Sequence, residues 1–338
     1  MGIAADWWRS GLTWRSIMLL PLSCLYGALV AVRGWLYRRG WLKAQRLPVP
    51  ILIVGNLVVG GTGKTPLAIA LAAALATRGF TPGLVSRGYG AKIKAPLEVD
   101  ADSDPSRVGD EPLLIRRRTG MPVWVAPDRV AAARALLAAH PRTDLLISDD
   151  GLQHLRLARD CEIAVFDGRG AGNGELLPAG PLRERLERLA SVDAVVVNGM
   201  QAAGLPQSAW TMRLAFDTLR QLNAPHAATN LKGLAGRRLA AVAGTGNPAR
   251  FFDALAAAGL KADAHAFPDH HAFKPDDFNA IDADIILMTE KDALKCASFV
   301  DPRLWVAPVT AIIPAGLIDA IVEKLEWTRN CLKSSSAR

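Results

Sequence analysis

A glycine-rich turn between an apolar run and a helix-like segment constrains the fold of this 338-residue chain more than any other feature. The turn reads Gly60-Gly-Thr-Gly-Lys64-Thr65; residues 51–54 precede it and Pro66 follows it. In such a turn, glycines let backbone N–H groups face phosphate oxygens, and the helix N-terminus adds a partial positive charge. The lysine neutralises the β- and γ-phosphates of a nucleotide, and the threonine hydroxyl ligates Mg²⁺. The sequence therefore predicts a P-loop that binds ATP and Mg²⁺.

The loop departs from the usual pattern, Gly-x-x-x-x-Gly-Lys-Thr, at its first position, which is Val58 here. The partitioning-type ATPases share Gly-Gly-x-Gly-Lys-Thr but place a lysine before the first of those glycines, where this chain has Val59. That difference disfavours the alternative of a membrane-tethered P-loop ATPase switch. The predicted nucleotide-binding residues are Val58, Val59, Gly60, Gly61, Thr62, Gly63, Lys64 and Thr65.

Short apolar runs alternate with amphipathic helical segments from residue 50 onwards, which is typical of a parallel sheet covered on both faces. The stretch 200–235 has weak periodicity and is expected to be a connection. We therefore predict an α/β fold: an N-terminal membrane-associated helix (1–45), a P-loop NTPase-like parallel-sheet domain (46–232) and a smaller C-terminal α/β domain (233–332). The expected strands are 51–54, 83–86, 123–126, 145–148, 162–166, 194–197, 238–243, 264–267, 284–288 and 305–309. The expected helices are 66–78, 128–140, 248–258 and one after Pro314.

The positive charge of the chain is concentrated at its N-terminus. Residues 1–50 hold seven basic side chains against one acidic, which is most of the formal net charge of +8. Within them, 16–32 is uncharged over seventeen residues, the lower limit for a spanning helix, and Pro21 would kink it. Five of the nine tryptophans bracket this run: Trp7, Trp8, Trp14, Trp35 and Trp41. A helix that dips into an anionic membrane surface is predicted, with a buried core helix as the alternative.

The distribution of charge and the spacing of the cysteines argue against several other classes of protein. A nucleic-acid binder would more often carry its basic excess on the folded domain, so no nucleic-acid partner is expected. The four cysteines are far apart and form no Cys-x-x-Cys pair, which argues against a zinc site or disulfide framework and suits a reducing cytoplasm. No obligate protein partner is evident. The denser positive charge after the apolar run predicts a peripheral (monotopic) protein whose remainder lies on the cytoplasmic side of the membrane.

Two pairs of acids are the candidates for metal binding and proton transfer. Asp149-Asp150 follows an apolar strand, where a Mg²⁺-orienting acid is expected in a P-loop enzyme, although an Asp-Asp-Gly turn is common by itself. Asp110-Glu111 starts a helix, where an N-terminal cap is the plain alternative. Phosphoryl transfer to a hydroxyl needs a carboxylate to accept the proton. Downstream, His270 or its neighbour His271 can orient such a carboxylate, or be a surface histidine.

Taken together, these segments resemble the lipid A 4'-kinase family over about residues 10–300. The shared markers are Leu19-Leu-Pro-Leu-Ser-x-Leu-Tyr-Gly27, Val54-Gly-Asn56, Lys64-Thr65-Pro66, Ser86-Arg-Gly-Tyr-Gly90, Gly109-Asp-Glu-Pro112, Asp149-Asp-Gly-Leu-Gln-His154, Gly172-Asn-Gly174, Leu177-Pro-Ala-Gly-Pro-Leu-Arg-Glu184, Asp269-His270 and Thr289-Glu-Lys-Asp-Ala293. The family does not require glycine at the position of Val58.

The resemblance implies an enzyme that transfers the γ-phosphate of ATP to the 4'-hydroxyl of a tetraacyl glucosamine disaccharide 1-phosphate. It implies a base at Asp110 with His270, while His271 falls at a variable position. Thr65, Asp149 and Asp150 match the metal site of the family. Glu111 and Arg183 match positions that face the substrate, with a looser assignment. The resemblance also implies a C-terminal domain that closes over the nucleotide.

Overall fold

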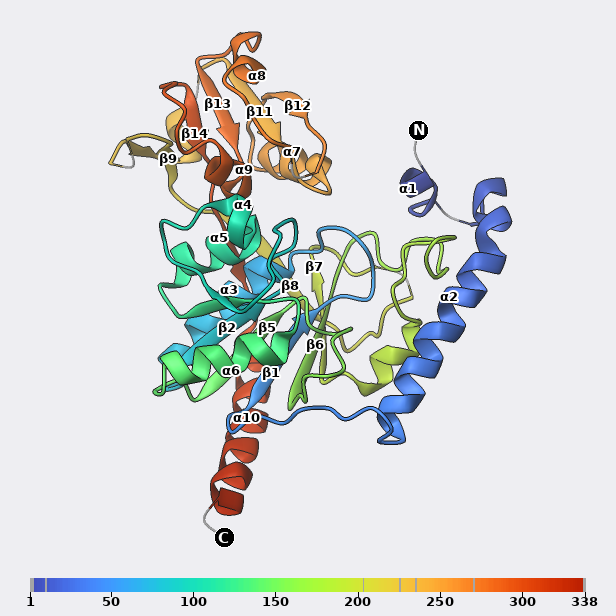
Figure 1. Cartoon of the computed structure of the whole chain (residues 1–338). Coiled ribbons are helices and arrows are strands. Elements are labelled where there is room, and N and C mark those ends of the chain that lie inside the picture. Colours follow the sequence, from blue (N-terminus) through green and yellow to red (C-terminus); the bar gives the residue numbers. More distant parts are fainter. Residues whose placement is uncertain are drawn as a thin grey trace.

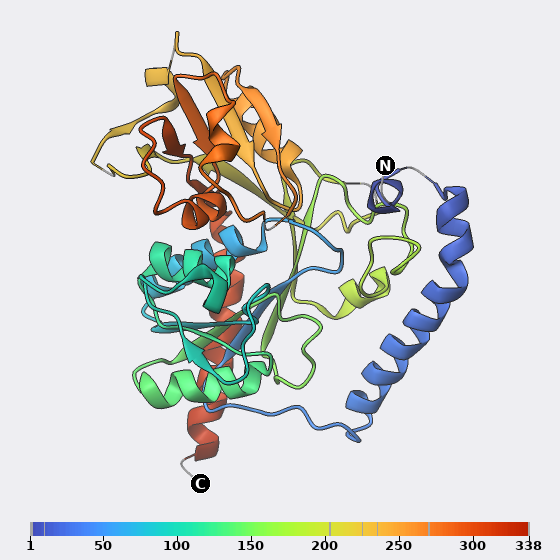
Figure 2. The ribbon, with the colours of Figure 1, turned by 45° about the horizontal axis from the view of Figure 1, so that its top comes forward.

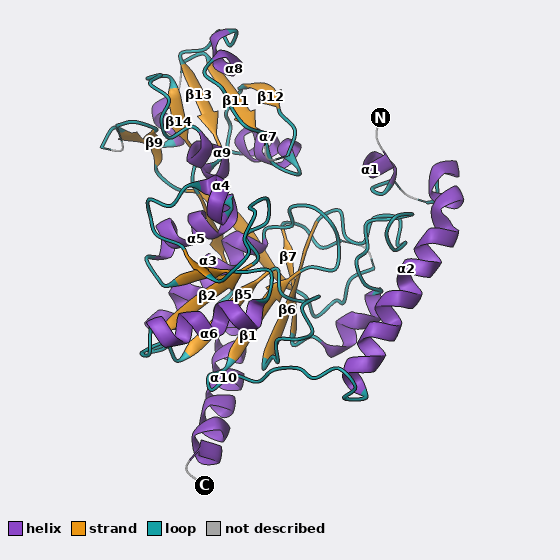
Figure 3. Ribbon diagram, in the orientation of Figure 1, coloured by secondary structure: helices purple, strands orange, loops and turns teal. Residues whose placement is uncertain are grey.

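The computed structural model describes residues 3–9, 11–202, 204–224, 226–234, 236–269 and 271–336. Within these ranges the chain forms one sheet of nine strands and one of six, with helices packed on them (Figure 1, Figure 3). The predicted α/β fold class is confirmed.

The larger sheet is mostly parallel and carries the P-loop strand near its centre. Its strands are β1 (Ile51–Gly55), β2 (Pro82–Ser86), β3 (Leu97–Glu98), β4 (Val123–Val125), β5 (Leu145–Asp149), β6 (Cys161–Asp167), β7 (Ala194–Asn198), β8 (Trp210–Phe216) and β15 (Val309–Ile312). Their order is β15-β8-β7-β6-β1-β5-β2-β4-β3, and only the edge strands β15 and β3 pair antiparallel. Every residue of β1 is buried, as expected of a strand covered on both faces. The six strands predicted for this region are all present.

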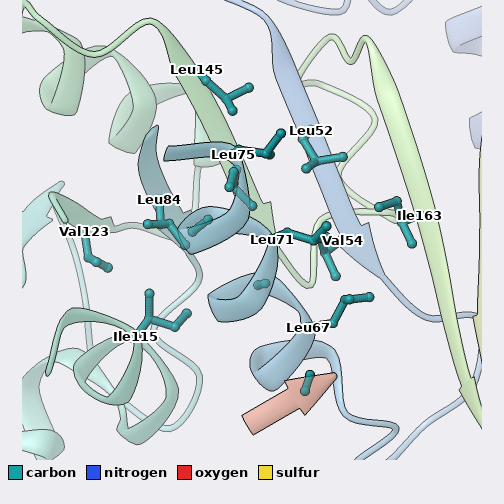
Figure 4. Close-up of a cluster of buried hydrophobic side chains, with 14 of the residues drawn as sticks. Leu52, Val54, Leu67, Leu71, Leu75, Leu84, Ile115, Val123, Leu145 and Ile163 are labelled. Atoms are coloured by element: carbon teal, nitrogen blue, oxygen red, sulfur yellow. The ribbon is translucent and has the colours of Figure 1, made fainter. Parts of the chain in front are cut away.

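Helices cover both faces of this sheet and give each face its own core. They are α3 (Lys64–Thr77), α4 (Pro105–Val108), α5 (Asp110–Thr119), α6 (Arg129–Ala139) and α10 (Ala315–Ser336), with the 3-10 turn η1 (Leu186–Ser191). On one face α3 inserts Leu67, Leu71 and Leu75 against β1 and β5 (Figure 4), and α10 extends this core with Leu317. On the other face α6 packs Leu136 into a separate cluster. The sheet is thus a rigid platform for the loops at its carboxyl edge.

The smaller sheet belongs to the C-terminal domain, above the carboxyl edge of the first sheet in Figure 1. Its order is β10-β9-β14-β13-β11-β12. The strands are β9 (Leu219–Gln221), β10 (Ala228–Thr229), β11 (Leu239–Ala243), β12 (Asp263–Ala266), β13 (Ile285–Met288) and β14 (Leu304–Val306). The helical segments are η2 (Leu231–Leu234), α7 (Pro248–Ala257), α8 (Asp276–Asn279) and α9 (Glu290–Lys295). Since α9 follows β13 directly, it lies at the end of the sheet that meets the first domain.

The chain crosses between the two domains differently from the sequence expectation. The stretch 200–235 is no mere connection, because it holds β8 of the first sheet and β9 and β10 of the second. The expected strand 305–309 is interrupted before Pro308, which has no N–H to donate to a ladder, and only its last residue, Val309, belongs to β15. Both β15 and α10 return to the first domain. Residues 309–336 therefore pack with the P-loop domain rather than with the C-terminal one.

The N-terminal segment forms α1 (Ile3–Asp6) and α2 (Trp14–Arg38), the latter continuous through Pro21. Thr13 caps α2 by accepting a hydrogen bond from the Ser16 N–H. Of the described part of the chain, α2 alone is long and apolar enough to cross a membrane, by length and composition. Only 11% of its apolar window is buried, so the alternative of a core helix is excluded. Figure 2 places α2 along one side of the first domain.

Candidate active site

The P-loop between β1 and α3 is shaped by two asparagine side chains. Asn56 donates from Nδ2 to the Gly60 carbonyl (3.3 Å), and Asn198, at the end of β7, donates from Nδ2 to the Thr62 carbonyl (3.2 Å). Gly63 has φ +98°, and a Cβ there would lie 2.4 Å from Asn198 Nδ2. Only glycine fits that position. The motif predicted the loop, but nothing in the sequence pointed to Asn198, which comes from a strand more than 130 residues away.

Val58 and Val59 anchor the loop rather than line its inner face. Val58 is fully buried and forms an isolated bridge with Leu182, and the Val59 N–H donates to the Pro181 carbonyl (2.9 Å). Arg183, which follows Leu182 in the chain, donates its N–H to the Leu57 carbonyl (2.7 Å). The start of the P-loop is therefore tied to 181–183, and the binding of nucleotide by Val58 and Val59 stays a prediction.

Thr65, in the first turn of α3, faces Asp149 at the end of β5. Because β5 is the parallel neighbour of β1, Asp149 lies in register with Val54, immediately before the P-loop. Thr65 donates from Oγ1 to Asp149 Oδ2 (3.3 Å). Burial, together with the charge of Glu111, raises the pKa of Asp149 to about 7. The predicted pair Thr65 and Asp149 is thus brought together by the sheet.

The donors at this point fit a magnesium ion. Asp149 is fully buried, and its Oδ1 has no hydrogen-bond partner among the described residues. A buried carboxylate oxygen without a donor needs a cation or water. Mg²⁺ uses one or two carboxylates together with substrate phosphates and water. In the described residues no group of three or more His, Cys, Asp or Glu side chains could hold a metal, so phosphate oxygens would complete such a site.

Asp150 points to a different set of partners from Asp149. Arg183 Nη1 contacts both of its carboxylate oxygens (3.0 and 3.1 Å), and Lys64 Nζ lies 3.6 Å from Oδ1. Burial acts to raise the pKa of Asp150, but Lys64 and Arg183 outweigh it and hold the pKa below its ordinary value. The predicted acidic pair is therefore divided: one carboxylate faces the threonine and the other holds two cations.

Arg129, the first residue of α6, was not predicted from the sequence. Its side chain is buried and its Nη2 lies 3.5 Å from the Asp150 carbonyl. Burial lowers the pKa of Arg129 to about 10, partly offset by Asp150 and Asp149. An arginine after an N-cap aspartate gives no local signal of this role, because the contact depends on how α6 packs against β2 and β4.

The second acidic pair opens α5 and meets lysines of the C-terminal domain. Asp110 is buried, with Lys295 Nζ 3.4 Å from its Oδ2, and Glu111 forms an ion pair with Lys291. The charge of Lys291 lowers the pKa of Glu111 against the effect of burial. Both lysines belong to α9. Lys291 falls inside the family marker Thr289-Glu-Lys-Asp-Ala293, and nothing in the sequence pointed to Lys295.

His270, the expected partner of Asp110, lies outside the described residues. Its neighbour His271 is engaged within its own domain, with Nε2 3.0 Å from Asp277 Oδ2. That contact supports leaving His271 out of the proposed pair. The dyad of Asp110 with His270 remains a prediction.

Comparisons with known proteins find one family across most of the chain. The family model described as tetraacyldisaccharide-1-P 4'-kinase (LpxK) matches residues 15–326. The chain is 50% identical to the tetraacyldisaccharide 4'-kinase of Chromobacterium violaceum, covering 96% of this chain and 98% of that one. It is 51% identical to the protein of the same name from Janthinobacterium sp. (strain Marseille), with 96% and 95% covered.

A solved structure gives the same result for the fold. The crystal structure of LpxK from Aquifex aeolicus in complex with ATP is 29% identical, with a TM-score of 0.77. The match covers 92% of this chain and 99% of that one. The P-loop, the acids at the carboxyl edge of the sheet and these full-length matches lead to one assignment: the chain belongs to the tetraacyldisaccharide-1-P 4'-kinase family.

Proposed function

We propose that this lipid kinase of lipid A biosynthesis transfers the γ-phosphate of ATP to the 4'-hydroxyl of a tetraacyl disaccharide 1-phosphate, with Asp110 as the proton acceptor. The activity and the use of ATP follow from family membership. The roles of individual residues, the metal and the membrane are our proposal. The observation that carries it is the convergence of the P-loop, the end of β5 and the start of α5: Thr65 contacts Asp149, and the charge of Glu111, the neighbour of Asp110, acts on Asp149.

On the nucleotide side, the residues of α3 and β5 divide the work. Lys64 is in place to neutralise the β- and γ-phosphates, and Asp150 keeps its ammonium group from swinging away. Thr65 and Asp149 would hold Mg²⁺, which when bound shields the negative charge of the phosphates. Arg183 is tethered to Asp150 (3.0 Å), so a second cation is held near the phosphates.

On the acceptor side, Asp110 is the carboxylate best placed to take a proton. It stands at the first position of α5, where Gly109 (φ +93°) turns the chain sharply. Asp149 faces Thr65 and Asp150 faces Arg183 of its own domain, whereas Asp110 meets Lys295 of the C-terminal domain. A general base of this kind acts late in a loose phosphoryl-transfer transition state. His270 would orient or tune it.

The lipid substrate and α2 support attachment to the cytoplasmic face of the inner membrane. An apolar row on α2 points away from the protein: Met18, Leu22, Leu25, Leu29 and Val32 are each more than half exposed. Their spacing of three and four residues places them on one helix face. The side of α2 that faces the protein contacts the segment 181–183, to which the P-loop is tied: Tyr26 donates from its hydroxyl to the Arg183 carbonyl (2.9 Å). An anionic membrane surface is the proposed partner of the basic residues that flank the row.

The substitution Asp110→Asn tests the base. Asparagine keeps the size of the side chain but cannot accept the proton, so kcat should fall by about 10²–10⁴ with little change in the KM for ATP. The measurement is transfer of labelled γ-phosphate to purified lipid acceptor in mixed micelles. The control is Asp276→Asn, on an exposed helix of the C-terminal domain, which should leave kcat unchanged.

Two results would count against this assignment. If Asp110→Asn changed only the Mg²⁺ dependence, Asp110 would belong with the metal ligands. If the wild-type chain released ADP without phosphorylating the lipid, the alternative of an ATPase switch would replace the kinase.

A further inference from the structure

The C-terminal domain docks on α5 of the P-loop domain through α9, and ion pairs connect the two helices (Figure 1). Three acid–base contacts run along the interface. They are Lys295 Nζ to Asp110 Oδ2 (3.4 Å), Lys291 to Glu111, and Arg118 Nη1 to Glu290 Oε1 (3.2 Å). Two of them end on the acids that open α5, so the docked domain reaches into the proposed acceptor site.

Lys295 is held firmly by its own domain before it reaches across. Its Nζ lies 3.4 Å from Asp292 Oδ1, and its side chain is only 13% exposed. Asp292 is itself fully buried and accepts hydrogen bonds from the Thr289 hydroxyl (2.6 Å) and the Gly244 N–H (3.1 Å). The ammonium group of Lys295 therefore presents a fixed point of positive charge to the Asp110 carboxylate.

Lys291 has the same relation to the second acid. Its ion pair with Glu111 is largely sheltered from water, since both side chains are less than one-third exposed. Burial acts to lower the pKa of Lys291, but the charge and hydrogen bond of Glu111, together with the charges of Asp269 and Asp110, raise it above its ordinary value, so the pair is ionised. Removing the lysine of such a pair leaves the negative charge of the carboxylate uncompensated.

We propose that Lys291 and Lys295 are positioning residues for phosphoryl transfer. These lysines belong to the C-terminal domain, and they hold the carboxylates of Asp110 and Glu111 at the start of α5. The acceptor site is therefore complete only when α9 is docked. This inference rests on the proposed function, in which Asp110 accepts the proton. It gives the C-terminal domain a role in orienting the base, in addition to the closure over the nucleotide that the family resemblance implies.

The third contact of the interface provides a matched control. Arg118 lies eight residues further along α5, about 12 Å from Asp110 at helical rise. It pairs with Glu290, Asp217 and Thr310 and not with either of the two acids that open α5. Arg118→Met should therefore remove one docking contact while Lys291 and Lys295 keep α9 docked on the two acids, whereas Lys295→Met removes a docking contact together with the partner of the base.

The experiment compares the full-length variants Lys295→Met, Lys295→Arg and Arg118→Met in mixed micelles, each checked by thermal melting. Misplacement of a catalytic group by about 1 Å can cost about a hundredfold in rate. We expect Lys295→Met to lower kcat by about that factor while the KM for ATP stays within about threefold. Lys295→Arg should recover at least about tenfold of the loss, and Arg118→Met should stay within about threefold of wild type.

A double substitution tests Lys291 by charge compensation. Lys291→Met alone should lower kcat, because Glu111 is left without its partner. Adding Glu111→Gln removes the uncompensated charge and should restore at least about tenfold of that loss. Failure of the second substitution to restore any activity would overturn the role of Lys291.

The role of Lys295 is decided by comparison with two other variants. Equal losses of kcat and melting temperature in Lys295→Met and Arg118→Met would mean that α9 only docks, and would overturn the proposal. The combination Lys295→Met with Asp110→Asn should be no slower than Asp110→Asn alone, because the two residues act as a unit. If Asp110→Asn kept wild-type kcat, the proposed base would fail; if it lost activity while Lys295→Met did not, only the positioning role would fail.

Discussion

The helices α2 and α3 are both apolar and flank the same site, yet their side chains have opposite surroundings. In α3, Leu67, Leu71 and Leu75 have no exposed surface and fill the core against β1. In α2, Leu25 and Leu29 are 58% and 62% exposed. One helix uses its apolar residues to hold the P-loop in place, and the other leaves them uncovered by protein. Apolar composition alone therefore does not say what a helix packs against.

The two helices also differ in how they reach the chemistry. The first residues of α3, Lys64 and Thr65, are themselves the predicted site residues. By contrast, α2 acts through hydrogen bonds to backbone: Ser23 Oγ donates to Leu176 (2.8 Å), and Arg33 Nη1 donates to Gln153 (3.0 Å). We infer that α3 serves catalysis directly and that α2 presents the lipid while supporting the loops around the site.

The largest expected difference is in stability. Leu71→Ala should lower the free energy of unfolding by about 2–5 kcal/mol, because it leaves a cavity between α3 and the sheet. Leu25→Ala, on the exposed face of α2, should change it by less than about 0.5 kcal/mol in detergent-free buffer. Denaturant titration followed by circular dichroism measures both. Similar losses would contradict the separation of the two helices into core and surface.

The next largest effect is on the chemical step at the start of α3. Lys64→Ala removes the cation that meets the phosphates and should lower kcat by at least about a hundredfold, or about 3 kcal/mol. Far-UV circular dichroism should stay native. Lys274→Ala, at an exposed position of the C-terminal domain, is the control and should keep wild-type turnover. Near-normal turnover in Lys64→Ala would remove the P-loop from the mechanism.

A smaller effect is expected from the outward face of α2, and only in the presence of lipid. Replacing Leu22, Leu25 and Leu29 together by serine should lower activity on bilayer substrate by at least about tenfold, because apolar contact with the membrane is lost. Activity on a short-chain soluble analogue should be unchanged. Tyr26→Phe, on the inward face, should instead affect both substrates equally, since its hydrogen bond goes to Arg183. Equal loss on both substrates in the triple variant would make the apolar row part of the folded core.

The smallest effect is on the pH dependence of stability. It involves His154, which follows the residue whose carbonyl Arg33 of α2 contacts. Burial lowers the pKa of His154 to about 4, and the charges of Arg129 and, more weakly, Arg33 of α2 act in the same direction. Since the unfolded value is about 6.5, this contribution to stability is complete above that pH and is lost as pH falls towards the folded value. Between about pH 6.5 and 5.5 it should amount to about 1 kcal/mol. His154→Gln should flatten this part of the pH–stability profile; an unchanged profile would contradict the burial of a neutral imidazole.

The sequence by itself determined the parts of this protein that depend on neighbouring residues. Glycines beside Lys64 and Thr65 specify a P-loop because φ and the helix N-terminus are local properties. Apolar runs of about five residues before turns predicted the central strands for the same reason. Asp149 was predicted beside the metal because parallel strands end at one edge, and its contact with Thr65 agrees.

The tertiary structure alone decided which distant residues meet. Asp149 and Asp150 are adjacent in the chain, yet a positive φ of 51° at Asp150 directs them to different partners. Asn198 reaches the P-loop only because β7 stands two strands from β1, and Lys295 reaches Asp110 only because α9 docks on α5. The return of β15 and α10 to the first sheet is of the same kind. Such contacts depend on packing between segments far apart in sequence, and local propensity carries no information about them.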